Sequence, residues 1–361
     1  MKRVVFFLVA AVTLFVSGCD KDNADDDKKV GTTQTVGLYV LSEGDWNAGN
    51  GQLVYFDYNS EDDQFVRNDN KRFQNFGDTP NDLIIYGAKM YAAIQGTGSD
   101  SEDGMVRVIN HETGATIKDI VIFLDNVEQQ PRRLASANGK LYVTLYSGAV
   151  AMIDTTLFTY QITTLSGTFS EGICVYGQSL YICNSGQGEE NTVSVVDIAT
   201  FTETEVIPVP YNPVNIVSAG NGELYINTAT IWTGAAAGTP SNVHVLSANS
   251  KTITRTFDTA VESIAAGEHY VYGAGFDWND FETTIIKINI ADKSVNQFTD
   301  DANEYEMGYK LAVNPVTNEV FLTAQFMEQS AYRFKEDGTY IETLDIGAQN
   351  GSAIVFVNKV K

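Results

Sequence analysis

The chain of 361 residues carries 46 acidic and 23 basic side chains, which gives a formal net charge of −23 at pH 7. Nucleic-acid binding needs clustered cations on the protein, so this charge argues against a nucleic-acid partner and favours cationic or neutral partners. The length is large for one simple core, and internal repeats are therefore expected.

The first 18 residues have the composition of an export signal. Lys2 and Arg3 precede the apolar run VVFFLVAAVTLFV, which is too short for an ordinary membrane span. The next segment, VSGC at residues 16–19, resembles the lipobox of bacterial lipoproteins, in which the signal is cleaved before a cysteine that is then lipidated. The resemblance implies a signal peptide over residues 1–18 and a lipid anchor at Cys19. The alternative is an ordinary signal peptide with a cysteine beside it.

Residues 19–35 are polar and charged and lack apolar periodicity, which predicts a flexible acidic tether after the lipidated cysteine. The run Asp25-Asp26-Asp27 resembles the export signal of Bacteroidetes lipoproteins that are displayed on the outer face of the outer membrane. This resemblance implies a lipid-anchored protein that faces the cell exterior. The alternative is a linker whose acidic residues serve only solvation.

Residues 36–361 repeat a β-hairpin that is followed by a third alternating strand and a fourth, more polar strand. An aromatic residue near the start of the second strand marks each copy, and successive copies are 39 to 51 residues apart. Four strands at this spacing are typical of a β-propeller blade, and we assign the marker aromatics to packing between blades. The six hairpins are residues 83–94, 134–145, 173–184, 216–227, 264–275 and 311–323, and their markers are Tyr91, Tyr142, Tyr181, Tyr225, Tyr272 and Phe321.

The two ends of the repeat region supply a seventh blade. Residues 37–44, 51–57 and 65–72 read as strands two, three and four without a first strand, whereas residues 352–358 read as a first strand alone. Joined, they close the ring and leave no open edge. We therefore predict an all-β fold, a seven-bladed β-propeller with four-stranded blades, closed by the N- and C-terminal strands in one shared blade.

Two cysteines remain in the repeat region. The hairpin that turns at Asn138-Gly139 pairs Ala135 with Tyr142, and the same register 39 residues later pairs Cys174 with Tyr181. Cys183 then lies diagonal to Cys174, too far for a comfortable disulfide. We expect free buried thiols, although a slip of one residue would pair the two cysteines directly.

The three tryptophans occupy one kind of loop. Trp46, Trp232 and Trp278 follow the marker aromatic of their repeats by six or seven residues, with Tyr39 as the N-terminal marker, and so fall between strands two and three. In a propeller these loops share a face with the connections between blades, and ligands usually bind there. Aromatic rings among amides and carboxylates predict a recognition surface for a bulky, partly apolar ligand or a protein partner. The alternative is that the rings fold down as lids over the blade ends.

The candidate ligand-binding residues follow from loop position alone. Blade-joining segments are expected to add polar groups to the same face. The candidates are Asp45, Trp46, Asn47, Gln95, Arg132, Tyr146, Asn184, Tyr211, Trp232, Phe276, Asp277, Trp278 and Phe326, and the further polar groups include Glu43, Asp78, Asn81, Asn215, Glu262, Lys310 and Asn350.

Motifs of catalysis and metal binding are absent from the sequence. No phosphate loop, nucleophile elbow or zinc motif occurs, and the three histidines, His111, His244 and His269, lie in different repeats. We expect no enzymatic activity and no cofactor. The acidic segment GSDSEDG, residues 98–104, is a candidate Ca²⁺ site that lacks the full loop pattern; a solvated acidic loop is the alternative.

Several segments resemble the YncE-like propeller lipoproteins of Bacteroidetes, above all NTVSVVDIAT (191–200), the repeated LYV hairpins and the lipoprotein N-terminus. The segments EGDWNAGNGQLVYFD (43–57), GDTPNDLIIYGAKMY (77–91) and AVNPVTNEVF (312–321) bring the BtuG-type members nearest. The resemblance implies capture of cobalamin or another corrinoid without chemistry, followed by transfer to a TonB-dependent outer-membrane transporter.

A corrin ring is wide and has apolar edges and amide arms, which suit aromatic rings and polar side chains respectively. Related propellers share the repeat motifs, so three other functions stay open. They are a glycan-binding surface lipoprotein, an adhesion or scaffold propeller that binds protein, and an enzyme such as a lyase.

Overall fold

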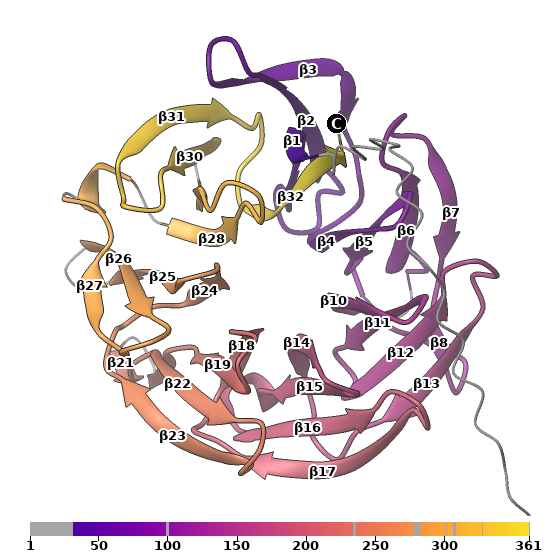
Figure 1. Ribbon diagram of the computed structural model, residues 1–361. Helices are drawn as coiled ribbons and strands as arrows, with labels where there is room; N and C mark the ends of the chain where they lie inside the picture. The colour runs from indigo at the N-terminus through magenta and orange to yellow at the C-terminus, as the bar shows by residue number, and fades with distance from the viewer. Residues whose placement is uncertain are drawn as a thin grey trace, which may run out of the picture.

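Seven antiparallel sheets of four strands surround a common axis in the computed structural model, and each sheet runs from an inner to an outer strand (Figure 1). This arrangement confirms the predicted seven-bladed β-propeller. No helix within the described ranges is long and apolar enough to cross a bilayer. The structure describes residues 32–98, 101–233, 236–277, 282–300, 302–305, 308–326 and 328–360.

Tight turns join the inner strand of most blades to the second strand. In the hairpin that turns at Asn138-Gly139, both residues have positive φ, 52° and 75°, which is the geometry that matches the twist of two paired strands. The first three complete blades are β4 (Pro80–Tyr86), β5 (Lys89–Ile94), β6 (Met105–Asn110) and β7 (Thr116–Ile120); β10 (Pro131–Ala137), β11 (Lys140–Leu145), β12 (Ala149–Asp154) and β13 (Tyr160–Thr164); and β14 (Ser170–Tyr176), β15 (Ser179–Asn184), β16 (Thr192–Asp197) and β17 (Thr202–Pro208).

The outer strands are the most polar and the most exposed, because only one of their edges is covered. The second strands are mostly buried, whereas the inner strands mix buried with partly buried residues. The next three blades are β18 (Pro213–Ser218), β19 (Glu223–Thr228), β22 (Asn242–Ser247) and β23 (Thr252–Phe257); β24 (Ser263–Ala266), β25 (Tyr270–Asp277), β26 (Glu282–Asn289) and β27 (Val295–Gln297); and β28 (Gly308–Val313), β29 (Val320–Ala324), β30 (Ser330–Phe334) and β31 (Tyr340–Asp345).

The seventh blade contains both ends of the repeat region, as predicted. Its inner strand is C-terminal, and the other three are N-terminal; the strands are β32 (Gly351–Val360), β1 (Thr33–Ser42), β2 (Gln52–Asn59) and β3 (Gln64–Phe73).

The first strand begins earlier than predicted. Residues 33–35, which we assigned to the tether, pair with β32, and Thr33 lies opposite Val360. The Thr35 hydroxyl lies within hydrogen-bonding distance of the side-chain oxygens of Asn358 (2.8 Å) and Asn314 (3.0 Å). The polar composition of residues 33–35 gave no sign of a strand. These residues pair through their backbone with a strand more than 300 residues away, and such pairing needs no apolar pattern.

The hydrophobic core consists of layers between neighbouring blades. All seven marker aromatics, Tyr39 included, are at most 2% exposed, which agrees with their assignment to packing between blades. Burial of one such side chain stabilises the fold by roughly 2 kcal/mol. The predicted hairpin register is also confirmed, since Cys174 pairs with Tyr181 and both cysteines are free. Burial raises the pKa of Cys174 to about 12, so this thiol is protonated and unreactive near neutral pH.

A buried histidine makes the fold sensitive to acid. His244 in β22 is 3% exposed, and its Nδ1 lies 2.9 Å from the hydroxyl of Thr256. Burial lowers the pKa of His244 from 6.5 to about 4. The unfolded chain therefore takes up this proton more readily, and stability that is complete above pH 6.5 is lost as the pH falls toward 4. The full interval corresponds to roughly 3 kcal/mol of unfolding free energy.

We predict that His244→Gln flattens the pH dependence of the unfolding free energy between about pH 6.5 and pH 4.5, because glutamine takes up no proton there. Urea denaturation at a series of pH values measures the slope. His269→Gln is the control, because His269 is exposed and lies 2.8 Å from Glu336 on the surface. A slope in His244→Gln equal to that of the wild type would contradict the assignment.

Candidate functional site

The loop face is the face on which second strands end and inner strands begin; for example, Pro80 at the start of β4 pairs with Ile94 at the end of β5. In six of the seven blades the pairing register shifts within the first residues of the inner strand. A shift of this kind breaks the strict alternation of side chains and redirects them. The side chains of consecutive residues in one inner strand can therefore both point toward the axis of the ring.

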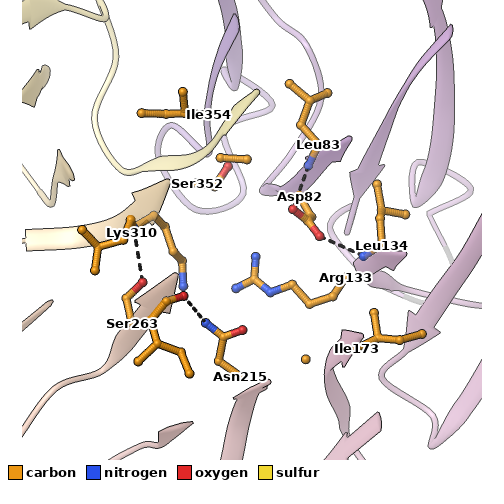
Figure 2. A pocket seen from close by; sticks show the side chains of 14 residues that line it. Asp82, Leu83, Arg133, Leu134, Ile173, Asn215, Ser263, Lys310, Ser352 and Ile354 are labelled. Carbon is orange, nitrogen blue, oxygen red and sulfur yellow. Dashed lines mark hydrogen bonds between the residues drawn. The ribbon is translucent and has the colours of Figure 1, made fainter. Parts of the chain in front are cut away.

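All seven inner strands contribute to a central cavity of about 180 Å³ (Figure 2). One residue in each inner strand occupies the same position in this lining. It comes directly before an apolar residue near the start of the strand. Of the seven residues, three are charged, two are polar and two are small. They are Asp82, Arg133, Gly172, Asn215, Ser263, Lys310 and Ala353.

A second pocket of about 200 Å³, which we call the mouth, lies on the loop-face side of the central cavity. The mouth and the central cavity share Arg133, Asn215 and Lys310, so the two spaces adjoin each other. Two of the candidate ligand-binding residues, Arg132 and Phe276, line the mouth, as do Asn215, Glu262 and Lys310 from the further polar groups predicted for this face. Its other lining residues are Glu171, Val214, Ala229, Gly308, Tyr309 and Gln325.

Charged and aromatic groups at the mouth are held by specific contacts. Arg132 donates from Nε to Glu171 Oε2 at 2.7 Å, and its guanidinium lies 5.1 Å from the ring centre of Tyr146. The Tyr146 ring in turn meets Phe169 edge-on at 5.8 Å. The predicted residues Arg132 and Tyr146 are therefore brought together, in a cation–π contact that fixes the guanidinium.

The other ionisable groups of this region differ in environment. The hydroxyl of Tyr309 donates to Glu43 Oε1 at 2.8 Å, and burial raises the pKa of Tyr309 well above its usual value. Burial also raises the pKa of Asp82, whose carboxylate accepts from the backbone of Leu83 and of Leu134. Burial, and then the neighbouring guanidinium groups, lower the pKa of Lys310 to about 7.

Trp46 lies in a loop that side-chain hydrogen bonds stabilise. The Asp78 carboxylate accepts from the backbone of Asn47 (3.3 Å) and Gly49 (2.8 Å), and Asp45 accepts from the Asn50 amide at 2.9 Å. The Trp46 side chain is 73% exposed. Its ring therefore does not fold down over the end of its blade.

Three further aromatic candidates are exposed around the same face. Trp232 is 43% exposed and lies in a two-stranded ribbon, β20 (Ile231–Thr233) with β21 (Ala236–Thr239), where we predicted a loop. Tyr211 and Phe326 are 54% and 44% exposed. With Trp46 they form the aromatic rim, and its members come from separate segments between strands.

Two candidates do not reach the surface, which corrects the prediction. Asn184 is fully buried, and its Nδ2 donates to Ser194 Oγ at 2.8 Å. Gln95 is 7% exposed and accepts from the Asn81 amide at 3.1 Å. Both lie at or just after the end of a second strand, where the side chains still serve packing inside the ring.

Some predictions lie outside the described residues. Trp278 and Cys19 belong to this group, and so does the side chain of Asp277, whose backbone ends β25. In the acidic segment 98–104, Asp103 accepts from the hydroxyl of Thr97 at 2.9 Å. Among the residues that the structure describes, no three His, Cys, Asp or Glu side chains group as metal ligands.

Sequence reasoning missed Arg133 and Asp82 as residues of the axis. Both precede an apolar residue at the start of an inner strand, as do Asn215 and Lys310, which we placed on the face. An alignment of the first strands at that apolar residue would have placed all four in one ring. The loop-based search passed over them because it looked between the strands.

No family model matches the sequence, and no curated protein matches it. Solved structures with the same architecture do exist. A putative 6-phosphogluconolactonase from Bacteroides uniformis is 11% identical, with a TM-score of 0.66 over 90% of this chain and 99% of that one. A protein from Lactobacillus plantarum is 13% identical, with a TM-score of 0.66 over 90% and 100% of the two chains. At these identities the likeness shows the propeller fold alone.

Proposed function

We propose that this protein is a surface-exposed outer-membrane lipoprotein that captures cobalamin or a related corrinoid on the loop face and passes it to a TonB-dependent transporter. The observation that carries the proposal is the aromatic rim around a polar, charged mouth. Exposed rings suit the apolar edges of a corrin, and the side chains of the mouth suit its amide arms. The segments that resemble the BtuG-type lipoproteins support the ligand class.

The size of the mouth indicates how such a ligand would bind. A pocket of about 200 Å³ is smaller than those that enclose a drug-sized molecule, which span roughly 300–1,000 Å³. A corrinoid would therefore lie across the mouth, on the aromatic rim, and insert only a small part into it. This placement leaves the outer side of the ligand open to a transporter.

The position at which the chain enters the propeller would allow the loop face to point away from a membrane. Thr33 begins β1 at the end opposite Trp46, and ten residues of strand separate the loop face from that end. An anchor at Cys19, joined through the acidic segment, would therefore attach to the far face. The aromatic rim would then point outward.

Binding without chemistry is the better reading of the mouth. Glu171, one of the two carboxylates that line the mouth, is held by Arg132, and among the described residues no histidine lines this pocket to pair with the other, Glu262. The Kuenenia stuttgartiensis hydrazine synthase, 14% identical with a TM-score of 0.62 over 78% of this chain and 95% of that one, shows that a similar fold occurs in an enzyme. We infer capture rather than catalysis.

We predict that the chain from residue 20 onward binds cyanocobalamin, and that Trp46→Ala and Trp232→Ala each weaken binding about tenfold or more, as loss of an aromatic contact typically does. Calorimetric titration measures the dissociation constants. Leu157→Ala is the control, because Leu157 is 71% exposed and lies in a turn at the opposite end of its blade.

The outcomes separate the ligand from the site. Tight binding that neither tryptophan substitution changes would keep the corrinoid and refute the aromatic rim as its site. No binding at micromolar protein would refute the corrinoid. Binding to an oligosaccharide panel would then favour a glycan receptor, and binding only to an outer-membrane protein would favour a scaffold.

A further inference from the structure

Two cations face the central cavity without a carboxylate partner. Arg133 on β10 and Lys310 on β28 both extend into it from well-separated blades (Figure 2). In the described part of the chain, neither forms an ion pair. The Arg133 guanidinium donates to the backbone carbonyl of Asn81, and the Lys310 ammonium lies 4.7 Å from the ring centre of Tyr309.

The nearby acids are engaged elsewhere or stand outside the cavity. Asp82, the one acid that lines it, accepts from two backbone N–H groups, and burial favours its neutral form. Glu171 is paired with Arg132, and Glu43 accepts from Tyr309. Glu262 lines the mouth but not the central cavity. The cavity is therefore lined by two cationic side chains against one carboxyl group, inside a protein whose net charge is −23.

The charge and environment of Lys310 favour an anion in the central cavity. The partly buried ammonium of Lys310 lies near two guanidinium groups, and desolvation together with their repulsion lowers its pKa to about 7. An anion between Lys310 and Arg133 would offset both the repulsion and the lost hydration. The Ser263 hydroxyl accepts only a long bond from the Leu311 backbone (3.4 Å), so its hydrogen remains available to donate.

We propose that the central cavity is a binding site for a small oxyanion, of the carboxylate, phosphate or sulfate class, held between the Arg133 guanidinium and the Lys310 ammonium. A volume of about 180 Å³ accepts such an ion and excludes a corrinoid. The anion is either a free ion or an anionic group of a ligand at the mouth, because Arg133 and Lys310 line both spaces. This site does not depend on the ligand proposed for the aromatic rim.

Sulfate is the probe, because its charge stays constant near neutral pH. Calorimetric titration of the chain from residue 20 onward, at constant ionic strength, should show one saturable site with a dissociation constant of about 1 mM or tighter at pH 6. Affinity should fall about tenfold or more by pH 8.5, because Lys310 loses its proton between these values. Absence of saturable binding at pH 6 would overturn the proposal.

Lys310→Met should abolish sulfate binding, and its thermal midpoint without sulfate should equal or exceed that of the wild type, because a partly buried cation that its neighbours repel is removed. Arg133→Gln is a second variant with the same expected loss. Lys118→Met, on the exposed strand β7, is the control and should bind as the wild type does. Unchanged binding in both cavity variants would refute the site, since it would place sulfate elsewhere.

A final titration of sulfate in the presence of cyanocobalamin distinguishes the two sources of the anion. Competition would assign the site to an anionic group of the ligand at the mouth. Independent binding would assign it to a free ion. A protein that binds sulfate but no corrinoid would keep this inference and remove the proposed function.

Discussion

A chain that ends at Asn350 is expected to lack a folded state. It loses β32, which pairs with β1 along nearly its whole length and is the inner strand of the closing blade. Ala353, Ile354 and Val357 leave the core with it, and β1 becomes an open edge that invites aggregation. Far-UV circular dichroism and size-exclusion chromatography should report an aggregated or expanded chain without cooperative unfolding.

A shorter deletion is the control for this experiment. A chain that ends at Asn358 loses only the pairs of Thr33 and Gln34 with the last residues of β32. It keeps the bond from Thr35 to Asn358 and every buried residue of the strand. It should therefore unfold cooperatively, near the wild-type midpoint. A monomeric, cooperative protein that ends at Asn350 would show that six blades hold together without the pairing of β32 with β1, which we call the seam.

Arg333→Met is expected to cost about 3–5 kcal/mol of unfolding free energy, the typical cost of breaking a buried charge network on one side. Arg333 in β30 is 1% exposed, and its guanidinium contacts Asp63 (2.7 Å), Glu319 (2.6 Å) and Glu342 (2.8 Å). Asp63 belongs to the turn between β2 and β3, so this cluster joins the closing blade to its neighbour. Without the guanidinium, the three carboxylates would repel one another. Urea denaturation at neutral pH measures the loss.

The structure offers a matched surface pair at the same junction. Arg67 on β3 reaches Asp345 at the end of β31 at 3.1 Å, but the side chain of Asp345 is 75% exposed. Exposed pairs contribute little because solvent screens them, so Arg67→Met should cost less than about 1 kcal/mol. Equal, small losses in Arg67→Met and Arg333→Met would refute the role of burial. Adding Glu319→Gln to Arg333→Met should restore part of the stability, because it removes one of the repelling charges.

The architecture could be predicted because it rests on local patterns repeated seven times. One well-defined turn, Asn138-Gly139, was enough to transfer a register 39 residues along the chain and pair Cys174 correctly with Tyr181. The seam could be predicted because an inner strand was missing at one end and present at the other. Strand alternation and turn chemistry are short-range properties that a single sequence displays.

The binding face was harder to predict because it depends on departures from those patterns. Asn184 and Gln95 sit at strand ends, and only the three-dimensional packing shows that they turn inward. Arg133 reaches the axis beside a break in pairing register. Its own strand does not show this, and only a comparison of all the first strands would have placed it there. The sequence placed Trp232 on the loop face. It did not show that the surrounding segment pairs as a two-stranded ribbon and is not an irregular loop.

The seam has a practical consequence for how this molecule can be held. Thr33 and Val360 face each other at the end of the closing blade that is opposite Trp46. A fluorescent fusion, an affinity tag or a linkage to a sensor chip that is joined directly before Thr33 or directly after Val360 would therefore leave from the same end of the closing blade. Immobilised through either end, the ring would present its tryptophan-bearing side to solution.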